Sequence, residues 1–363
     1  MRTGTANLPL HGGQAPRWLF QRMVSLSREI VCYIVDEFGV GEVLQRLSDP
    51  VWFQSLGCVL GFDWHSSGLT TTTTGALKEA LRDVGPEMGL FVAGGKGKVS
   101  RRTPEEIMRF GEEHALVKPA DSLVYASRMS AKVDNTAVHD GYQLYHHCFV
   151  FTRQGEWAVV QQGMNETNSQ ARRYHWLWRP ETDFDFVNEP HSGVISEQKA
   201  LEILNLVARE SDGCRRVCAS MAAESPAQVS RELGKMKELS MPAAHVFSLD
   251  DLMPRSVERI LLKTYENPPA DFEALLGTRG VGPKTIRALA LIAEVLHGTP
   301  ASRRDPALYS FAHGGKDGIP YPVDHETYDR SIEILREATA RAKIGDTERK
   351  RALQRLALWE TKR

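Results

Sequence analysis

The chain has 363 residues, of which 42% are hydrophobic and 25% charged, and its formal net charge is −1. This composition is typical of a folded globular protein with one large domain or two smaller ones. A net charge this close to zero excludes nucleic-acid binding through the overall field of the protein, so any such binding must come from local basic patches.

The cysteines and the N-terminus bear on the cellular compartment. The five cysteines show no disulfide-framework spacing, which favours a reducing compartment, and Cys214 and Cys218 have no second Cys/His pair at metal-site spacing. Residues 1–13 lack the apolar core of a signal peptide, and no stretch approaches the roughly 18 apolar residues of a membrane span. The sequence therefore predicts a cytoplasmic protein with no membrane partner.

Several local patterns in the first half predict individual helices and strands. Residues 58–63 are expected to form a buried strand that ends in a carboxylate, and a helix is expected over 75–82, after a Ser/Thr-rich loop. A Thr-Pro-Glu-Glu capping box predicts that a helix starts at Thr103. The apolar runs 144–152 and 157–163 flank a short polar turn, which predicts a β-hairpin.

The second half has helical periodicity instead. Residues 196–207 carry apolar positions at helical spacing behind a serine, and further helices are expected to begin near 225, 256, 284 and 326, with a basic amphipathic helix at the C-terminal end. The loop-like residues 188–193 mark a domain boundary. The predicted fold class is therefore α+β, with a mixed α/β domain over 1–192 and an all-helical domain over 193–363.

A glycine-containing turn in the second half has the pattern of a helix-hairpin-helix. Its glycines let backbone N–H groups approach a phosphate, and the helix that follows adds the positive end of its dipole. The pattern predicts DNA-backbone contacts by Gly280, Val281, Gly282, Lys284 and Thr285. A helix-loop-helix of the core that binds no ligand is the alternative.

The same stretch resembles the DNA glycosylase superfamily typified by endonuclease III and the oxoguanine glycosylases. That resemblance rests on GVGPKT, with Lys284 at the position of the Schiff-base lysine, and on YPVDHETYDR, with Asp324 at the position of the catalytic aspartate. It implies a Schiff base between Lys284 and the sugar of a flipped nucleotide, assisted by Asp324. The alternatives are a Lys284 that only contacts phosphate and an Asp324 that caps a helix. No four-cysteine motif follows, so no iron–sulfur cluster is expected.

The interval between Lys284 and Asp324 is longer than that superfamily normally shows. Residues 303–322 are therefore expected to form an inserted loop, rich in glycine and containing His313, Lys316 and Asp317. Such a loop can carry function because its backbone can approach a ligand closely, and a plain turn-rich loop is the alternative.

Polar residues in the first half suggest a second candidate site. Asp63 and His65 precede a run of threonines, a combination suited to a metal or a phosphate. Carboxylates, a histidine and glutamines follow on or near the predicted hairpin, namely Asp134, Asp140, His147, Gln161 and Gln162. Carboxylates on strands can hold Mg²⁺ or Mn²⁺ in a nuclease centre, although the acidic-x-lysine element of such centres is missing.

Two basic stretches are candidates for contacts with nucleic acid. The first is a glycine-containing loop with Lys96, Lys98, Arg101 and Arg102, which is suited to gripping phosphates or is simply a solvated loop. The second mixes aromatics with cations, a combination typical of surfaces that stack bases, and contains Arg172, Arg173, His175 and Trp176.

Over nearly its full length the chain resembles a prokaryotic family catalogued as domain of unknown function 763. The strings that carry this resemblance are DWHSSG, VQQGMN, RYHW and FAHGGKDG. The leading functional hypothesis is a protein that binds and processes DNA in repair, as a glycosylase or abasic-site lyase. The alternatives are a metal-dependent nuclease with its centre in the first half and a DNA-structure-binding adaptor without catalysis.

Overall fold

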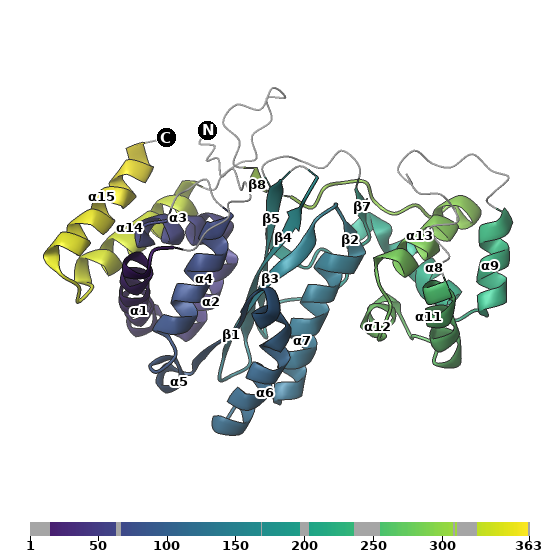
Figure 1. Cartoon of the computed structure of the whole chain (residues 1–363), viewed down its shortest axis with the longest axis horizontal. Helices are drawn as coiled ribbons and strands as arrows, with labels where there is room; N and C mark the ends of the chain where they lie inside the picture. Colours follow the sequence, from purple (N-terminus) through teal and green to yellow (C-terminus); the bar gives the residue numbers. More distant parts are fainter. Residues whose placement is uncertain are drawn as a thin grey trace.

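The computed structural model describes residues 15–62, 67–167, 169–196, 203–235, 255–307, 309–310 and 325–361. Within these ranges the chain forms a mostly antiparallel sheet with helices on both faces and a further group of helices beyond one side of it (Figure 1). The protein is therefore α+β, in agreement with the fold class expected from the sequence.

The main sheet has the strand order β1-β3-β4-β5-β6-β8 in the described part of the chain. Neighbouring strands are antiparallel except β6 and β8, which are parallel. The predicted hairpin is confirmed as β3 and β4, where Phe151 pairs with Trp157 next to the turn. The strands are β1 (Leu90–Lys96), β3 (Gln143–Thr152), β4 (Trp157–Asn165), β5 (Gln170–Trp178), β6 (His191–Ser196) and β8 (Tyr309–Ser310).

Alternation along the strands divides the interior into two hydrophobic cores. On β4, Trp157 and Val159 belong to one core, whereas Ala158 and Val160 belong to the other. This follows because successive side chains of a strand point to opposite faces of the sheet. The two faces of the central strands are therefore both buried, and polar residues on them must find partners inside the protein.

The N-terminal helices cover one face together with the last two helices of the chain. Tyr33 donates a hydrogen bond to Glu337 at 2.7 Å, and Arg341 bonds Glu37 at 2.9 Å, so the first described helix contacts a helix from the C-terminal part of the chain directly. The helices of this layer are α1 (Arg17–Phe38), α2 (Val40–Ser48), α3 (Pro50–Leu60), α4 (Gly68–Ala80), α5 (Gly85–Met88), α14 (His325–Arg341) and α15 (Asp346–Thr361).

The opposite face carries α6 (Thr103–Glu113) and α7 (Ala120–Lys132), which continues into the π-helix η2 (Val133–Ala137). Beyond α7 lies a helical group that shares the core of this face (Figure 1). It consists of α8 (Asp212–Ala222), α9 (Pro226–Lys235), α11 (Arg255–Glu266), α12 (Phe272–Gly277) and α13 (Pro283–His297), with the short segments β2 (Val138–His139), β7 (Leu204–Asn205) and η3 (Arg209–Ser211) beside it.

The helices predicted near residues 103, 225, 256, 284 and 326 are confirmed as α6, α9, α11, α13 and α14. Three other expectations are wrong. Residues 58–60 end the helix α3 instead of forming a strand, and the threonine run lies inside α4. The residues described within 196–207 include the end of β6 and the short strand β7, so that stretch is not one helix.

The expected boundary at 192–193 falls inside β6. Residues 193–363 contribute most of β6 and all of β8 to the main sheet, and β7, which pairs with β2 in a separate two-stranded sheet. They also return α14 and α15 to the N-terminal helices, so this half is not built of helices alone. Local periodicity could not show this, because the contacts join parts of the chain hundreds of residues apart.

Candidate functional site

The turn between α12 and α13 leaves the start of α13 open. Gly280 has a φ of 103°, a left-handed conformation that favours glycine. Gly282 is the N-cap of α13 in extended conformation, no side chain caps this end, and Pro283 occupies the start of the helix. Two features thus meet here: N–H groups without a capping side chain, and the positive end of a 15-residue helix.

The side chains around this turn divide between the core and the surface. Val281 and Thr285 are 1% exposed, and the apolar residues Ile286, Leu289, Ala290 and Ala293 of α13 are buried in the core. Arg279 and Lys284 are exposed, and the ion pairs among the described residues include neither of them. The sequence contains no Asp or Glu from 274 to 293, so the charged residues closest to the turn along the chain are cations.

Lys132, at the end of α7, connects the turn to the sheet. Its ammonium group donates a hydrogen bond to the carbonyl oxygen of Val281. Burial lowers the pKa of Lys132 below its usual value, because the charged form loses hydration. Arg287 of α13 lies 3.2 Å from Nδ1 of His139, which provides a second link between this helical group and the residues after α7.

A second basic element, η1 (Gly97–Arg102), lies between β1 and α6. Lys96, Lys98, Arg101 and Arg102 are all exposed, as expected for a phosphate-gripping loop, and none of them belongs to an ion pair among the described residues. Exposure of these cations fits both interpretations of the stretch, a phosphate-binding site and a solvated loop, so phosphate binding here stays a prediction.

The backbone of β1 is held firmly at Gly94, shortly before η1 begins. Gly94 donates its N–H to Glu106 at 2.7 Å, and its carbonyl accepts a bond from Lys78 at 2.8 Å. Gly94 has a φ of 91°, and an added Cβ would lie 2.2 Å from the carbonyl oxygen of His147. Only glycine fits this position, so the cations that follow are displayed from a fixed backbone.

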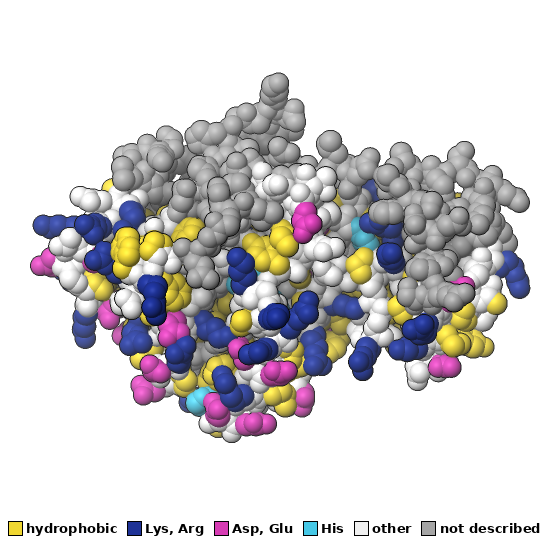
Figure 2. All heavy atoms as spheres, viewed as in Figure 1, with side chains coloured by type: hydrophobic (Ala, Val, Ile, Leu, Met, Phe, Trp, Pro, Cys, Tyr) yellow, Lys and Arg dark blue, Asp and Glu magenta, His cyan; other side chains and the backbone are white. Residues whose placement is uncertain are grey.

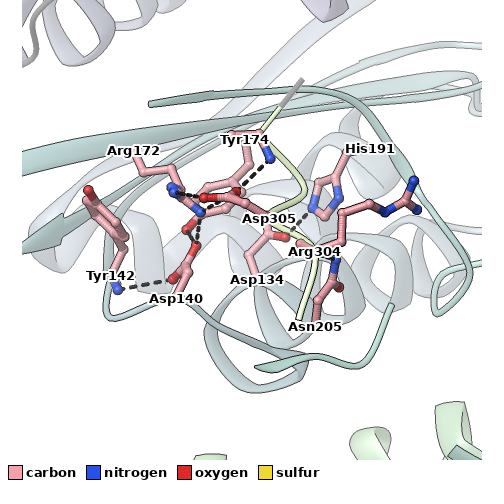
Figure 3. Close-up of polar contacts among 10 residues, drawn as sticks. Asp134, Asp140, Tyr142, Arg172, Tyr174, His191, Asn205, Arg304 and Asp305 are labelled. Atoms are coloured by element: carbon pink, nitrogen blue, oxygen red, sulfur yellow. Dashed lines mark hydrogen bonds and ion pairs between the residues drawn. The ribbon is translucent and has the colours of Figure 1, made fainter. Parts of the chain in front are cut away.

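Asp134 is the centre of a buried polar network on the α7 side of the sheet (Figure 3). Its carboxylate lies 2.5 Å from Nε2 of His191 and accepts bonds from Gln161 at 2.5 Å and from the Trp176 indole at 3.0 Å. The Gln161 amide nitrogen donates to Asp134, so the amide oxygen of Gln161 is the atom that accepts a hydrogen bond from Nδ1 of His147. Nε2 of His147 then accepts from the Ser127 hydroxyl at 2.8 Å, which requires a neutral ring.

Arg172 occupies the neighbouring part of the same face between two carboxylates. It bonds Asp140 at 3.0 Å and binds Asp305 through both terminal nitrogens, at 3.1 and 2.8 Å (Figure 3). Tyr174 donates its hydroxyl to Asp140 at 2.6 Å. Burial alone lowers the pKa of Arg172, but the two carboxylates raise it above its usual value, so the guanidinium stays charged.

A different set of polar side chains fills the opposite face. Gln162 bonds Thr70, the Tyr145 hydroxyl and, at 2.9 Å, the carbonyl of Ser67. Arg173 donates to Nε2 of His175 at 2.9 Å, and Nδ1 of His175 bonds the Leu47 carbonyl at 2.8 Å. Burial lowers the pKa of Arg173 to about 9.

These positions correct the interpretation of the aromatic and cationic stretch in β5. Arg172, Arg173, His175 and Trp176 are 0% exposed, so these side chains do not form a surface that stacks bases or neutralises phosphates. The reason is the alternation of the strand, which sends Arg172 and Trp176 into one core and Arg173 and His175 into the other.

The candidate N-terminal site is only partly assembled within the described residues. Asp134, His147 and Gln161 are brought into one hydrogen-bonded chain, Asp140 lies beside them in the Arg172 cluster, and Gln162 faces the other way. The described ranges contain no group of three or more His, Cys, Asp or Glu side chains placed to hold a metal ion. Asp63, His65, His313, Lys316, Asp317 and Asp324 lie outside the described residues.

Sequence reasoning missed the partners of these residues. His191, Asp305 and Lys132 carried no motif of their own, and each acts through a residue distant in sequence. The one available signal was indirect: buried acidic and basic residues on a strand require partners of opposite charge.

Fold and site together define an α+β protein whose mostly antiparallel sheet holds buried polar networks and whose helical group presents an open, cationic turn. The chain belongs to the family described as protein of unknown function DUF763, which matches residues 4–323. No curated protein and no solved structure matched the chain. In the described part of the chain, no helix combines the length and the apolar character needed to cross a membrane.

Proposed function

We propose that this protein binds DNA and processes it in repair, gripping the sugar–phosphate backbone at the turn between α12 and α13. The observation that carries the proposal is the uncapped start of α13, which follows the left-handed Gly280 and displays the exposed Lys284. Backbone N–H groups at a helix start, the helix dipole and a lysine together make a site for a phosphate.

Within this proposal, the reaction is that of a DNA glycosylase or abasic-site lyase, with Lys284 as the nucleophile. Its amine, once deprotonated, adds to C1′ of the ring-opened abasic sugar, and loss of water gives an imine. Removal of a proton from C2′ then breaks the C3′–O bond, and the 3′ phosphate leaves. The resemblance of GVGPKT to the endonuclease III superfamily supports this assignment, and Asp324 remains the proposed assisting carboxylate.

The alternative of a metal-dependent nuclease receives less support from the described residues. Asp134 accepts three bonds from protein donors, and Asp140 is held by Arg172 and Tyr174. Carboxylates engaged in this way would have to break those bonds before they could bind a cation.

Borohydride trapping on duplex DNA with one abasic site tests the chemistry. We expect a covalent adduct with the wild-type protein, its loss in Lys284→Ala, and its retention in Lys263→Ala, which removes another exposed lysine from the same helical group. No adduct with the wild type would refute the lyase, and an adduct unchanged in Lys284→Ala would refute the assignment of Lys284. Tight binding without turnover would favour the non-enzymatic adaptor.

A further inference from the structure

The four cations at η1 lie at the same end of the α6–α7 pair as the turn between α12 and α13. The helix α6 begins directly after η1, residues 114–119 connect it to α7, and the two helices pack together side by side (Figure 1). Two consecutive helices packed this way across a short connection run antiparallel. The start of α6 and the end of α7, at Lys132, therefore lie next to each other.

Lys132 contacts the turn itself, since it bonds the Val281 carbonyl. The axes of packed helices are about 8–10 Å apart, so about one helix spacing separates α6, which begins directly after η1, from α7, which carries Lys132. The exposed Arg128, one helical turn before Lys132 on α7, adds a further cation near this end. Figure 2 shows Lys and Arg side chains across the middle of this face, over α6 and α7, with Asp and Glu side chains among them toward its lower edge.

We infer that these residues form one cationic band, which binds a DNA duplex at two places: the turn between α12 and α13 and, separately, η1. The band consists of Lys96, Lys98, Arg101, Arg102, Arg128, Arg279 and Lys284. The contact at η1 goes beyond the proposed function, which requires only the turn, and it extends the footprint of the protein on the DNA.

Charge favours a polyanion at η1. Lys96, Lys98, Arg101 and Arg102 fall within seven consecutive residues, and the neighbouring Glu106 is already bound to Lys78 at 2.6 Å. Glu105 is the other carboxylate close in sequence, so an excess of positive charge remains. A duplex carries one negative charge per about 1.7 Å of its axis, so a band of this kind meets several phosphates at once.

The side chains at η1 favour a duplex over a single strand. Surfaces that hold single strands stack the bases on aromatic rings, whereas duplex binding needs only backbone contacts. The stretch from Lys96 to Arg102 has no aromatic residue, and Val99, 41% exposed, is its one large apolar side chain on the surface. The half-buried ring of Tyr145 lies beside the stretch, but Lys96 Nζ already lies over it, 5.8 Å from its centroid. The fixed backbone at Gly94 presents the cations without a large cost in ordering on binding.

Two contacts with one duplex are also expected to raise the overall affinity, because they are linked through the same protein. Once the turn holds the DNA, binding at η1 becomes intramolecular, so the second contact raises affinity without being tight alone. Removing cations from η1 must therefore weaken binding and reduce its dependence on salt, even when the turn is intact.

The test compares the full-length protein with the triple variant Lys98→Gln, Arg101→Gln, Arg102→Gln by fluorescence anisotropy on a 30-base-pair duplex across a salt series. The matched control, Lys343→Gln, Lys350→Gln, Arg351→Gln, removes the same charge from exposed positions in α15 and in the short connection before it. For the η1 variant we expect binding weakened by about tenfold or more and a slope of log K against log salt smaller by about 2–3. For the control we expect a slope within about one unit of the wild type.

An unchanged salt slope and affinity in the η1 variant would overturn the inference. Losses of affinity and slope in the control equal to those in the η1 variant would also overturn it, as would tighter binding of the protein to phosphatidylserine vesicles than to the duplex. Protection of Lys98 from acetylation by the duplex gives a second readout on the wild-type protein, and its absence would also count against the contact. The variant Gly282→Asp separates this inference from the proposed function. If it leaves binding unchanged while the η1 variant loses it, the turn is refuted and η1 stands; the reverse pattern refutes η1 and retains the turn.

Discussion

Replacing Gly282 tests whether a phosphate sits at the start of α13. An added Cβ at this position has no neighbour closer than the Gly280 carbonyl oxygen, at 3.9 Å, and the extended backbone is one that N-cap residues normally adopt. Both Gly282→Asn and Gly282→Asp therefore fit the folded protein. Each is a good N-cap, so the stability of the protein should stay the same or rise by a few tenths of a kcal/mol.

The two variants share one effect on DNA binding and differ in another. Either side chain accepts a bond from an N–H group in the first turn of α13 and takes it away from the phosphate, a loss of about 1.5–3 kcal/mol because the acceptor is charged. Asp adds repulsion: two unit charges 4 Å apart interact by about 1 kcal/mol in water and about 4 kcal/mol at a protein surface. Gly282→Asp should therefore bind about fivefold to several hundredfold more weakly than Gly282→Asn.

Fluorescence anisotropy with a duplex at fixed salt measures this ratio directly, and thermal unfolding checks that both variants are folded. The difference should shrink as salt rises, because screening reduces the repulsion. Equal affinities for the Asp and Asn variants, at low salt and with both proteins folded, would show that no phosphate lies at the start of α13.

Three further predictions concern the buried groups. Arg172→Met leaves the carboxylates of Asp140 and Asp305 without their cation and should lower the free energy of unfolding by about 3–5 kcal/mol. Arg82→Met breaks the exposed ion pair with Glu79 and should lower it by less than about 1 kcal/mol. Urea denaturation of both variants measures the difference. Burial lowers the pKa of His146 to about 3 and that of His147 to about 4, so the unfolded chain binds more protons below pH 6.5. The free energy of unfolding should therefore fall as the pH drops from about 6.5 to about 4, by about 2 kcal/mol per histidine at pH 5. His146→Asn should reduce that fall. A stability that does not change over this pH range would contradict the conclusion that both histidines are buried in the neutral form. Gly94→Ala should destabilise the protein more than Gly97→Ala, since only the former meets a carbonyl oxygen at 2.2 Å, and equal melting temperatures would refute this reasoning.

The elements that the sequence predicted correctly are those with strong local signals. The hairpin of β3 and β4 has two apolar runs joined by a polar turn, and α6 and α13 have Pro at their starts. Signals of this kind depend on neighbours in the chain, so tertiary contacts do not alter them.

Helices that are buried on nearly all sides escaped the same reasoning. In α3 every residue is buried except Cys58, which is half-buried, so no polar face marks the helical period and the run resembles a strand. In α4 packing against the sheet overrides the β-preference of five consecutive threonines.

The buried networks could not be predicted because their partners are far apart. Asp134 and His191 are separated by 57 positions, and Arg172 and Asp305 by 133. Arginines beside aromatic residues in β5 have the composition of a nucleic-acid surface, yet alternation places them in two cores. Composition alone does not distinguish a nucleic-acid-binding surface from a strand that is buried on both faces. The structure distinguishes them because it shows the burial of both faces.

The stretch from Lys132 to Asp140 explains how the proposed DNA contact is tied to the sheet. Lys132 bonds the carbonyl of Val281 in the turn, Asp134 enters the network of His191, and Asp140 pairs with Arg172. A π-helix occupies the middle of this stretch, a conformation that often marks functional sites. A backbone held inside the protein by two carboxylates cannot shift without breaking their bonds, so Lys132 keeps the turn at a fixed position relative to α6, α7 and η1. A duplex bound at the turn would then always meet η1 in the same register, which is the condition for two modest contacts to act as one strong one.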